Sequence, residues 1–293
     1  MNVAEIMEKR NAFSFEVFPP KTDVGMEKLC GEGGVLEQLY TLHPDYISCT
    51  YGAGGTNVGK NLEVLDKITK DGKAIGVTHF TCVGNTKEGI KEQLNTYLDH
   101  GINHMLALRG DLPRDGAFPH PDGYHHASEL MEEIRTFGGF CIGGACYPEG
   151  HPESATLYED IDNLKYKVDA GCEFLTTQMF FDNNELYSYL YKLRRSGIDI
   201  PVIAGIMPVT NASQIKRIMS LSGSQLPARF RAIIDRFAGL DRAAGEELGI
   251  EISVQAAKAA LPYADGFYLM TPFNRVALME RLIARLKEEV IKD

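Results

Sequence analysis

Residues 13–18 read FSFEVF, a short aromatic and β-branched run that is followed at once by two prolines. Such a run is typical of a β-strand, and proline ends it because proline cannot donate a hydrogen bond to a sheet. Successive side chains of a strand point to opposite faces. Phe13 and Phe15 are therefore expected to face covering helices, whereas Ser14 and Glu16 are expected to face the other side, which in a closed barrel is the interior.

Seven further runs of this kind follow, and longer segments with helical periodicity separate them. The strand candidates are residues 13–18, 45–50, 74–80, 104–109, 140–147, 173–178, 201–206 and 265–270. The helical patterns cover residues 25–41, 59–70, 86–100, 127–137, 155–170, 183–196, 211–221, 228–237, 243–261 and 273–290. Eight strands, each followed by at least one helix, predict a single α/β domain, a (β/α)8 TIM barrel over residues 1–293. A doubly wound parallel sheet is the alternative, because the number of strands does not show closure.

The composition fits a globular enzyme of this size. The chain has 293 residues, of which 44% are hydrophobic and 24% are charged, and its formal net charge is −10. This acidic balance argues against nucleic-acid and membrane partners, which require clustered cations. No apolar run reaches the roughly 18 residues of a membrane helix, and the first residues lack the apolar core of a signal peptide. A cytoplasmic protein is predicted, in which six cysteines without any CxxC pair serve as core residues.

Polar residues recur where the predicted strands end. In a parallel barrel the catalytic groups come from these carboxyl ends, so convergence on one rim is expected. The residues concerned are Glu16, Thr50, Tyr51, His79, Arg109, Gly110, Asp111, Tyr147, Gln178 and Arg275.

Two of these positions carry a carboxyl group. Burial of Glu16 among aromatic residues would raise its pKa, which suits a general acid near neutral pH. The alternative is a structural glutamate paired with an Arg or Lys. Asp111 follows Arg109 and Gly110 and is either a catalytic carboxylate or part of a strand-end turn with a local ion pair.

Several other rim residues have both a binding and a structural interpretation. His79 and His151 are either ligand contacts or hydrogen-bonded loop histidines. Gln178, followed by two phenylalanines, suits recognition of a heterocycle beside a stacking face, although a core aromatic cluster explains the phenylalanines equally well. The helix after the fifth strand carries three polar residues on one face, which is either solvated or turned toward a ligand: Asp160, Asn163 and Lys167.

Other motifs do not support a site. Residues 54–61, GGTNVGKN, nearly match the phosphate-binding loop GxxxxGK[ST], but Asn61 replaces the hydroxyl residue that binds Mg²⁺. No GxGxxG follows the first strand, which argues against a Rossmann dinucleotide site. The histidines form no HExxH pair, and no metal site is predicted.

Eight motifs in order resemble those of the methylenetetrahydrofolate reductase family, from about residue 12 to the C-terminus: FSFEVFPPKT, CTYGAGGT, THFTC, ALRGDLP, YPEGHPE, NLKYKVDAG, TTQMFFD and GIMPVTN. The resemblance implies a barrel that holds FAD without a Rossmann domain. It implies reduction of 5,10-methylenetetrahydrofolate to 5-methyltetrahydrofolate by NAD(P)H, with NADH favoured, through ping-pong hydride transfer. The product would supply methyl groups for methionine synthesis.

The resemblance also assigns residues. Glu16 would be the general acid that protonates N10 of the folate, and Asp111 would lie near the flavin and the pterin. The implied FAD contacts are Thr50, Tyr51, Ala53, His79, Arg109, Gly110, Asp111, His126, Tyr147, His151, Asp160, Asn163 and Lys167. The implied substrate contacts are Glu16, Asp111, Gln178, Gln214 and Arg275.

The chain departs from the family pattern at several points. Tyr166 stands in place of an Arg, His126 in place of a Tyr beside the flavin, and Ile218 in place of a Phe that stacks on substrate; the MTPFNR segment also differs. Because the chain ends soon after the barrel, inhibition by S-adenosylmethionine is not expected. A homo-oligomer is expected.

Two alternatives to a stand-alone reductase stay open. The first is a flavin-bearing subunit that receives electrons from an iron–sulfur partner protein; without CxxC pairs, this chain would not carry the cluster itself. The second is a barrel without flavin, such as a pterin-binding methyltransferase or an aldolase.

Overall fold

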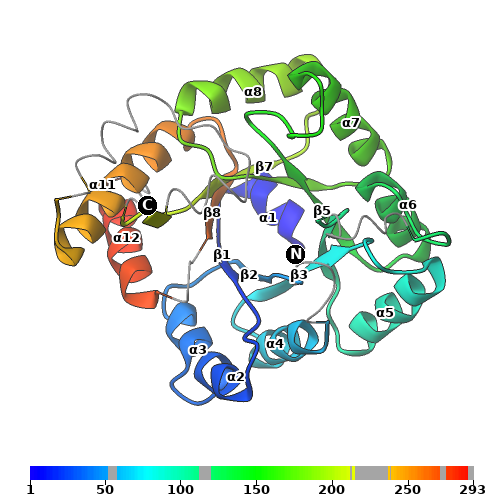
Figure 1. The fold of residues 1–293 in the computed structure, drawn as a ribbon, viewed down its shortest axis with the longest axis horizontal. Helices are drawn as coiled ribbons and strands as arrows, with labels where there is room; N and C mark the ends of the chain where they lie inside the picture. The colour runs from blue at the N-terminus through cyan, green and yellow to red at the C-terminus, as the bar shows by residue number, and fades with distance from the viewer. Residues whose placement is uncertain are drawn as a thin grey trace.

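Eight parallel strands close into a barrel in which each strand pairs with the next along the chain (Figure 1). The computed structural model describes residues 1–51, 58–111, 120–211, 213–214, 237, 239–270 and 275–289. The strands are β1 (Ala12–Val17), β2 (Tyr46–Cys49), β3 (Ile75–Thr81), β4 (His104–Leu108), β5 (Cys141–Cys146), β6 (Phe174–Thr177), β7 (Val202–Ile206) and β8 (Gly266–Met270). Parallel pairing of β1 with β8 closes the sheet, which confirms the predicted barrel and excludes the doubly wound alternative.

Helices surround the barrel (Figure 1). In the described residues these are α2 (Asp23–Cys30), α3 (Val35–Tyr40), α4 (Val58–Asp71), α5 (Lys87–Asp99), α6 (Ala127–Phe137), α7 (Leu157–Asp169), α8 (Asn183–Arg195), α11 (Arg242–Ala260) and α12 (Val276–Glu289), and a further helix, α1 (Val3–Lys9), lies at one end of the barrel. The single helix predicted for 25–41 is wrong, because two helices form there. Glycines interrupt it: Gly33 has φ +67°, and a Cβ at Gly31 would lie 2.4 Å from the carbonyl oxygen of Glu27. The patterns at 211–221 and 228–237 lie largely outside the described residues.

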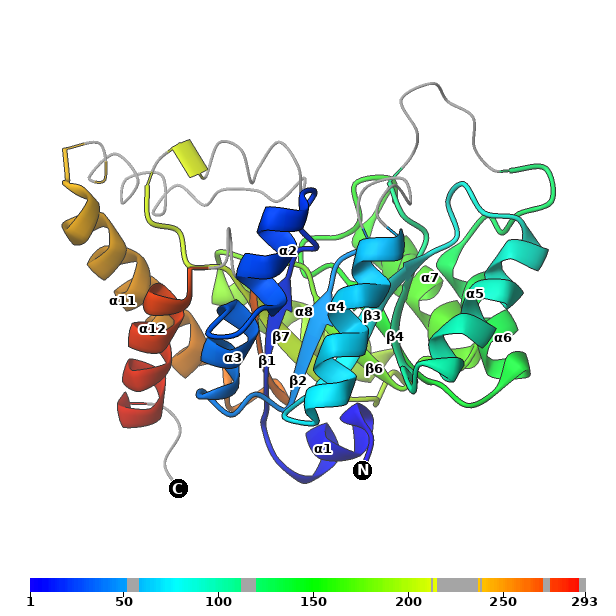
Figure 2. The same cartoon turned by 90° about the horizontal axis from the view of Figure 1, so that it is seen from below.

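The short helix α1, which the sequence analysis did not predict, covers the amino-terminal end of the barrel (Figure 2). A capping box between Asn2 and Glu5 starts it. Its buried residues Val3 and Met7 join an interior cluster that includes Leu106 of β4. Because α1 closes this end, the opposite end is left for chemistry.

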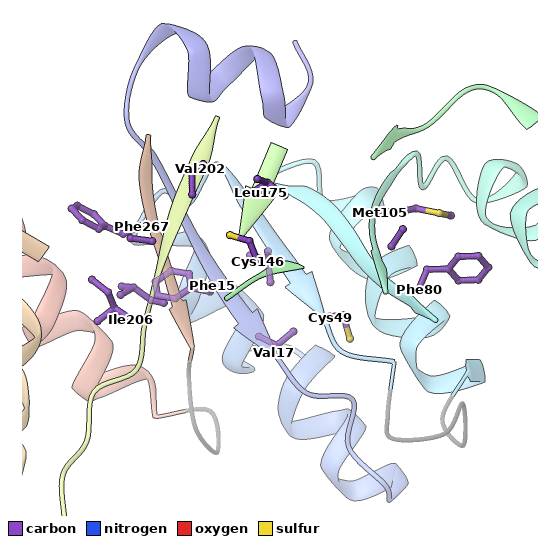
Figure 3. Packing of buried hydrophobic residues seen from close by; sticks show 14 of the residues in the cluster. Phe15, Val17, Cys49, Phe80, Met105, Cys146, Leu175, Val202, Ile206 and Phe267 are labelled. Atoms are coloured by element: carbon purple, nitrogen blue, oxygen red, sulfur yellow. The ribbon is translucent and has the colours of Figure 1, made fainter. Parts of the chain in front are cut away.

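The barrel wall separates two apolar regions, as the alternation in β1 predicts. Phe15 packs in the cluster between strands and helices, and Figure 3 shows Phe80 and Phe267 of that cluster extending outward from two sides of the barrel. Ser14 and Glu16 are buried and bond to β8, on the inner side. The cysteines are free, and all but the half-buried Cys30 are buried, which confirms their predicted role as core residues.

Gly143 of β5 allows the ring of Phe174 to fill the barrel. A Cβ at Gly143 would lie 2.3 Å from Cζ of Phe174, which no rotamer change of a buried ring relieves easily. We expect Gly143→Ala to lower the free energy of unfolding by about 1–3 kcal/mol through overpacking. Denaturant unfolding measures this change in the free energy of unfolding. Gly59→Ala in α4 is the control, since a Cβ there meets nothing within 4 Å. Equal stability of both variants would contradict this packing argument.

Candidate active site

Four polar side chains meet inside the barrel and form what is called here the Glu16 network: Glu16 of β1, Ser48 of β2, His79 of β3 and Tyr268 of β8. The Tyr268 hydroxyl donates to Glu16 Oε2 at 2.5 Å. The same hydroxyl lies 2.6 Å from Ser48 Oγ and 3.1 Å from His79 Nε2. All four residues are buried. Strand register brings them together, because Glu16 pairs with Ser48 across β1–β2 while Ser14, two residues earlier, pairs with Tyr268.

Burial sets the charge state of this network. It raises the pKa of Glu16 to about 7, against a smaller opposing effect of the Tyr268 hydrogen bond. Burial also lowers the pKa of His79 to about 4, so this ring is neutral at pH 7 although Nε2 lies 3.7 Å from Glu16 Oε2. A carboxyl held in an ion pair would have a lowered pKa. The raised pKa therefore favours the general-acid interpretation of Glu16 over the structural ion pair.

Tyr268 and Ser48 were not among the site residues predicted from the sequence. The alternation within GFYLM and YISC is the signal that could have placed both on the inner face, as it did for Glu16. Neither pattern gives the register between the first and last strands, so only barrel closure shows that the phenol meets the carboxyl.

A second polar group lies at the exits of β4 and β5. The Arg109 guanidinium binds the Glu153 carboxylate through two hydrogen bonds of 2.6 Å each. The rings of Tyr147 and His151 meet edge to face at 4.8 Å. Burial raises the pKa of Tyr147 to about 12, and the charge of nearby Asp160 contributes in the same direction.

The helix α7 contributes the ionisable part of this second group. Asp160 is buried, and burial raises its pKa despite the opposing effect of Lys167. The Lys167 ammonium donates to the carbonyl oxygen of Ala145 at 3.0 Å, and burial lowers its pKa. Asn163, between them in sequence, is exposed. The predicted polar face of α7 is thus turned toward the barrel rim at its two charged positions.

Three of the predicted substrate contacts, Gln178, Gln214 and Arg275, lie at the exits of β6, β7 and β8. Thr210 joins two of them, because its backbone N–H donates to Gln214 Oε1 at 3.1 Å and its hydroxyl accepts from Arg275 Nη1 at 2.8 Å. Gln178 lies at the exit of β6, where its Oε1 accepts from the backbone N–H of Met179. Of the two phenylalanines that follow, Phe180 is buried in the core.

The other predicted contacts are more dispersed. Thr50 is half-buried, and its backbone N–H bonds to β1. The Tyr51 side chain lies among the helices, edge to face with Phe80 at 5.9 Å. Asp111 and His126 are exposed, the latter as N-cap of α6.

Four further positions were singled out from the sequence. Gly110 has φ +95°, as a sharp turn at the rim requires. Tyr166, which departs from the family pattern, is 65% exposed. Ala53 and Ile218 lie outside the described residues.

The near-match to a phosphate-binding loop has a structural explanation. Asn61 is buried, and its Nδ2 donates to the carbonyl oxygens of Cys49 and Thr50 while its Oδ1 accepts from Tyr97. Lys60 pairs with an aspartate of α2 at 2.8 Å. Residues 52–57 are outside the described part of the chain. Within that part, no group of three or more His, Cys, Asp or Glu residues could hold a metal ion.

A membrane-spanning helix is also absent from the described ranges, where no helix is long and apolar enough to cross a bilayer.

Sequence comparison gives consistent matches. A family model described as methylenetetrahydrofolate reductase matches residues 2–287. The 5,10-methylenetetrahydrofolate reductase of Pectobacterium carotovorum is 33% identical over 240 residues, covering 82% of this chain and 77% of that protein. A Zea mays protein named methylenetetrahydrofolate reductase (NADH) 1 is 32% identical over 86% of this chain, which spans 44% of the plant protein.

Structure comparison gives similar barrels. A Clostridium thermocellum protein that binds two copies of 5-methyl-5,6,7,8-tetrahydrofolic acid superposes with a TM-score of 0.64. The alignment covers 97% of this chain and 96% of that one, at 15% identity, and at this identity the likeness supports the fold alone.

Proposed function

Since the chain belongs to the methylenetetrahydrofolate reductase family, we propose that it reduces 5,10-methylenetetrahydrofolate to 5-methyltetrahydrofolate with NADH, through FAD, in a ping-pong reaction. The family makes the chain an oxidoreductase of folate one-carbon metabolism. The observation that carries the proposal is the buried carboxyl of Glu16 at the inner rim, with a pKa of about 7. A carboxyl of this kind is a proton donor at neutral pH.

The residues at the exits of β4 and β5 fit FAD. Lys167 and Asp160 are ionisable groups held in the protein despite the cost of burial, and Arg109 adds a second cation nearby. Cations bind the diphosphate of a dinucleotide, and a carboxylate accepts hydrogen bonds from ribose hydroxyls. When bound, FAD would supply a two-electron carrier between the nicotinamide and the folate. If the hydride donor NADH and the hydride acceptor methylenetetrahydrofolate used this site in turn, the reaction would be ping-pong.

Glu16 acts in the folate half of the reaction. Its proton goes to N10 as the bond between N10 and the bridging methylene breaks, and the lone pair of N5 forms the iminium that then takes up hydride. Each turnover therefore consumes NADH and one proton. Glu16 has no role in hydride donation by NADH, because N10 of the folate is absent from that step.

The exits of β6, β7 and β8 would hold the folate. Gln178 and Gln214 present amide groups suited to a pterin, and the Arg275 guanidinium is suited to a carboxylate such as those of the glutamate tail. The joint contact of Gln214 and Arg275 with Thr210 supports their action as one unit.

Absorption spectroscopy of the purified protein tests this function. We expect a flavin spectrum that NADH bleaches anaerobically and that methylenetetrahydrofolate restores. A yellow protein that NADH fails to bleach would favour the subunit that depends on an iron–sulfur partner. A colourless protein that binds no added FAD would contradict the proposal.

Asp111 provides a further prediction. A carboxylate beside the flavin disfavours the negative charge of the reduced form, so Asp111→Asn is expected to change the rate of flavin reduction. Loss of a hydrogen bond from the pterin to a charged group should also weaken folate binding, by about tenfold or more. Stopped-flow reduction and folate titration measure both, with exposed Asp122→Asn as the control. An unchanged rate and an unchanged folate Kd would remove Asp111 from the site.

A further inference from the structure

We propose that Tyr268 is the positioning residue for the Glu16 proton donor. Its hydroxyl holds Oε2, which directs the proton of the neutral carboxyl to Oε1, and it stabilises the carboxylate that remains after proton transfer. This inference rests on the proposed function, in which Glu16 protonates the folate. Neither the family motifs nor the strand-end pattern points to Tyr268, which lies within β8 rather than at its exit.

The phenol has one proton to donate and three neighbours to satisfy. The Glu16 Oε2 contact is the shortest at 2.5 Å, followed by Ser48 Oγ at 2.6 Å and His79 Nε2 at 3.1 Å. Ser48 carries its own proton and can donate to the phenol oxygen, which leaves the phenol proton for Glu16. The network is thus consistent with a phenol that donates in one direction, toward the carboxyl.

The barrel interior holds the phenol in this orientation. Tyr268 is 2% exposed, and its ring stacks on that of Tyr46 at 6.3 Å with 28° between the ring planes. The residue is anchored by β8, which pairs with β1 through Ser14. A side chain so enclosed has few other rotamers, so the hydrogen bond to Glu16 is preorganised.

The hydrogen bond strengthens as Glu16 loses its proton. A bond to an ionised acceptor is roughly twice as strong as one between neutral groups. Among the residues that the structure describes, the titratable groups that face or lie near Glu16 include His79 of β3, Tyr268 of β8 and Tyr46 of β2, and each of these three is neutral at pH 7. The thiol of Cys49, which is also on β2, is buried on the helix side of the barrel wall and is neutral as well. Among these groups, Tyr268 is the one whose hydrogen bond favours the carboxylate against burial.

The test compares two buried tyrosines of the barrel interior. Tyr268→Phe removes the hydroxyl that bonds to Glu16, and Tyr46→Phe removes a buried hydroxyl that makes no hydrogen bond within the described part of the chain. Infrared spectra of the flavin-loaded protein follow the protonated carboxyl band against pH, and Glu16→Gln identifies that band. We expect Tyr268→Phe to shift the midpoint of Glu16 upward by about one to two pH units. Tyr46→Phe should leave it in place.

The kinetics give a second readout. In Tyr268→Phe we expect folate reduction to slow by about 10- to 100-fold, with the loss confined to that half-reaction. An unmoved carboxyl midpoint, or an equal shift in both variants, would overturn the role of Tyr268. If Glu16→Gln slowed both half-reactions equally, the general-acid role of Glu16 would fail instead, whatever the infrared midpoints, and a protein that binds no FAD would overturn the proposed function itself. Should Tyr268→Phe not fold, Ser48→Ala is expected to shift the midpoint upward by less, because it removes the group that polarises the phenol. No upward shift in Ser48→Ala would then overturn the proposal.

Discussion

Glu16→Gln is expected to slow folate reduction by about 10²–10⁴-fold while flavin reduction by NADH continues. The amide is close in size to the carboxyl and accepts the same hydrogen bond from Tyr268, so the barrel should remain intact. It has no proton of suitable acidity to give to N10. The effect is therefore confined to the half-reaction in which the bond between N10 and the methylene breaks.

Stopped-flow experiments on the two half-reactions measure this selectivity. Glu173→Gln is the matched control, because Glu173 is a half-buried glutamate just before β6, at the opposite end of the barrel, where its carboxylate accepts from the backbone of Ile142. We expect this control to retain both half-reactions. An equal loss of both rates in Glu16→Gln would show that Glu16 is not the general acid.

The folate half-reaction is expected to lose rate above pH 7, by about 50-fold between pH 7 and pH 9. Burial raises the pKa of Glu16 to about 7, so the proton-donating form is half populated there and falls about tenfold with each further pH unit. His79 does not contribute to this loss of rate above pH 7, because the lowered pKa of its ring keeps it neutral throughout the range.

The rate at which methylenetetrahydrofolate reoxidises prereduced enzyme, followed from pH 6 to 9, measures this decline. The rate of flavin reduction by NADH over the same range is the reference. A tenfold fall already between pH 6 and pH 7, as the ordinary glutamate pKa of about 4.3 would give, would mean that Glu16 is not buried in the working enzyme. If both half-reactions lost rate in the same way, the pH dependence would belong to a group other than Glu16.

Most of the fold could be predicted because its signals are local. Each predicted strand appears within a residue or two of its predicted ends, since β-branched and aromatic runs bounded by turns report directly on strands. The misses also have local causes. Helical periodicity continues across 25–41, whereas the glycines at 31, 33 and 34 end one helix and start another. The helix α1 is too short to produce a clear pattern, and tertiary packing on the barrel stabilises it.

The site residues also divide into those that a local pattern predicts and those that only the fold brings together. Glu16 could be predicted because its position is anomalous within one strand, as an acidic residue on the inner face of a run rich in aromatic residues. Arg109 was found at a strand end, but its partner Glu153 is 44 residues away, and no pattern in the chain connects the two. Asn61 is the reverse case, a residue singled out by a motif that the structure shows to be a buried hydrogen-bond junction.

By itself, the sequence determined the order of strands and helices, the inward direction of Glu16 and the family of the chain, because each depends on neighbouring residues or on motifs that can be compared one by one. Only the tertiary structure decided that the carboxyl of Glu16 is desolvated and that Tyr268 is its hydrogen-bond donor. These two residues are 252 positions apart and meet through closure of β1 on β8. Desolvation is a property of everything packed around a group, and therefore no single segment of the chain specifies it.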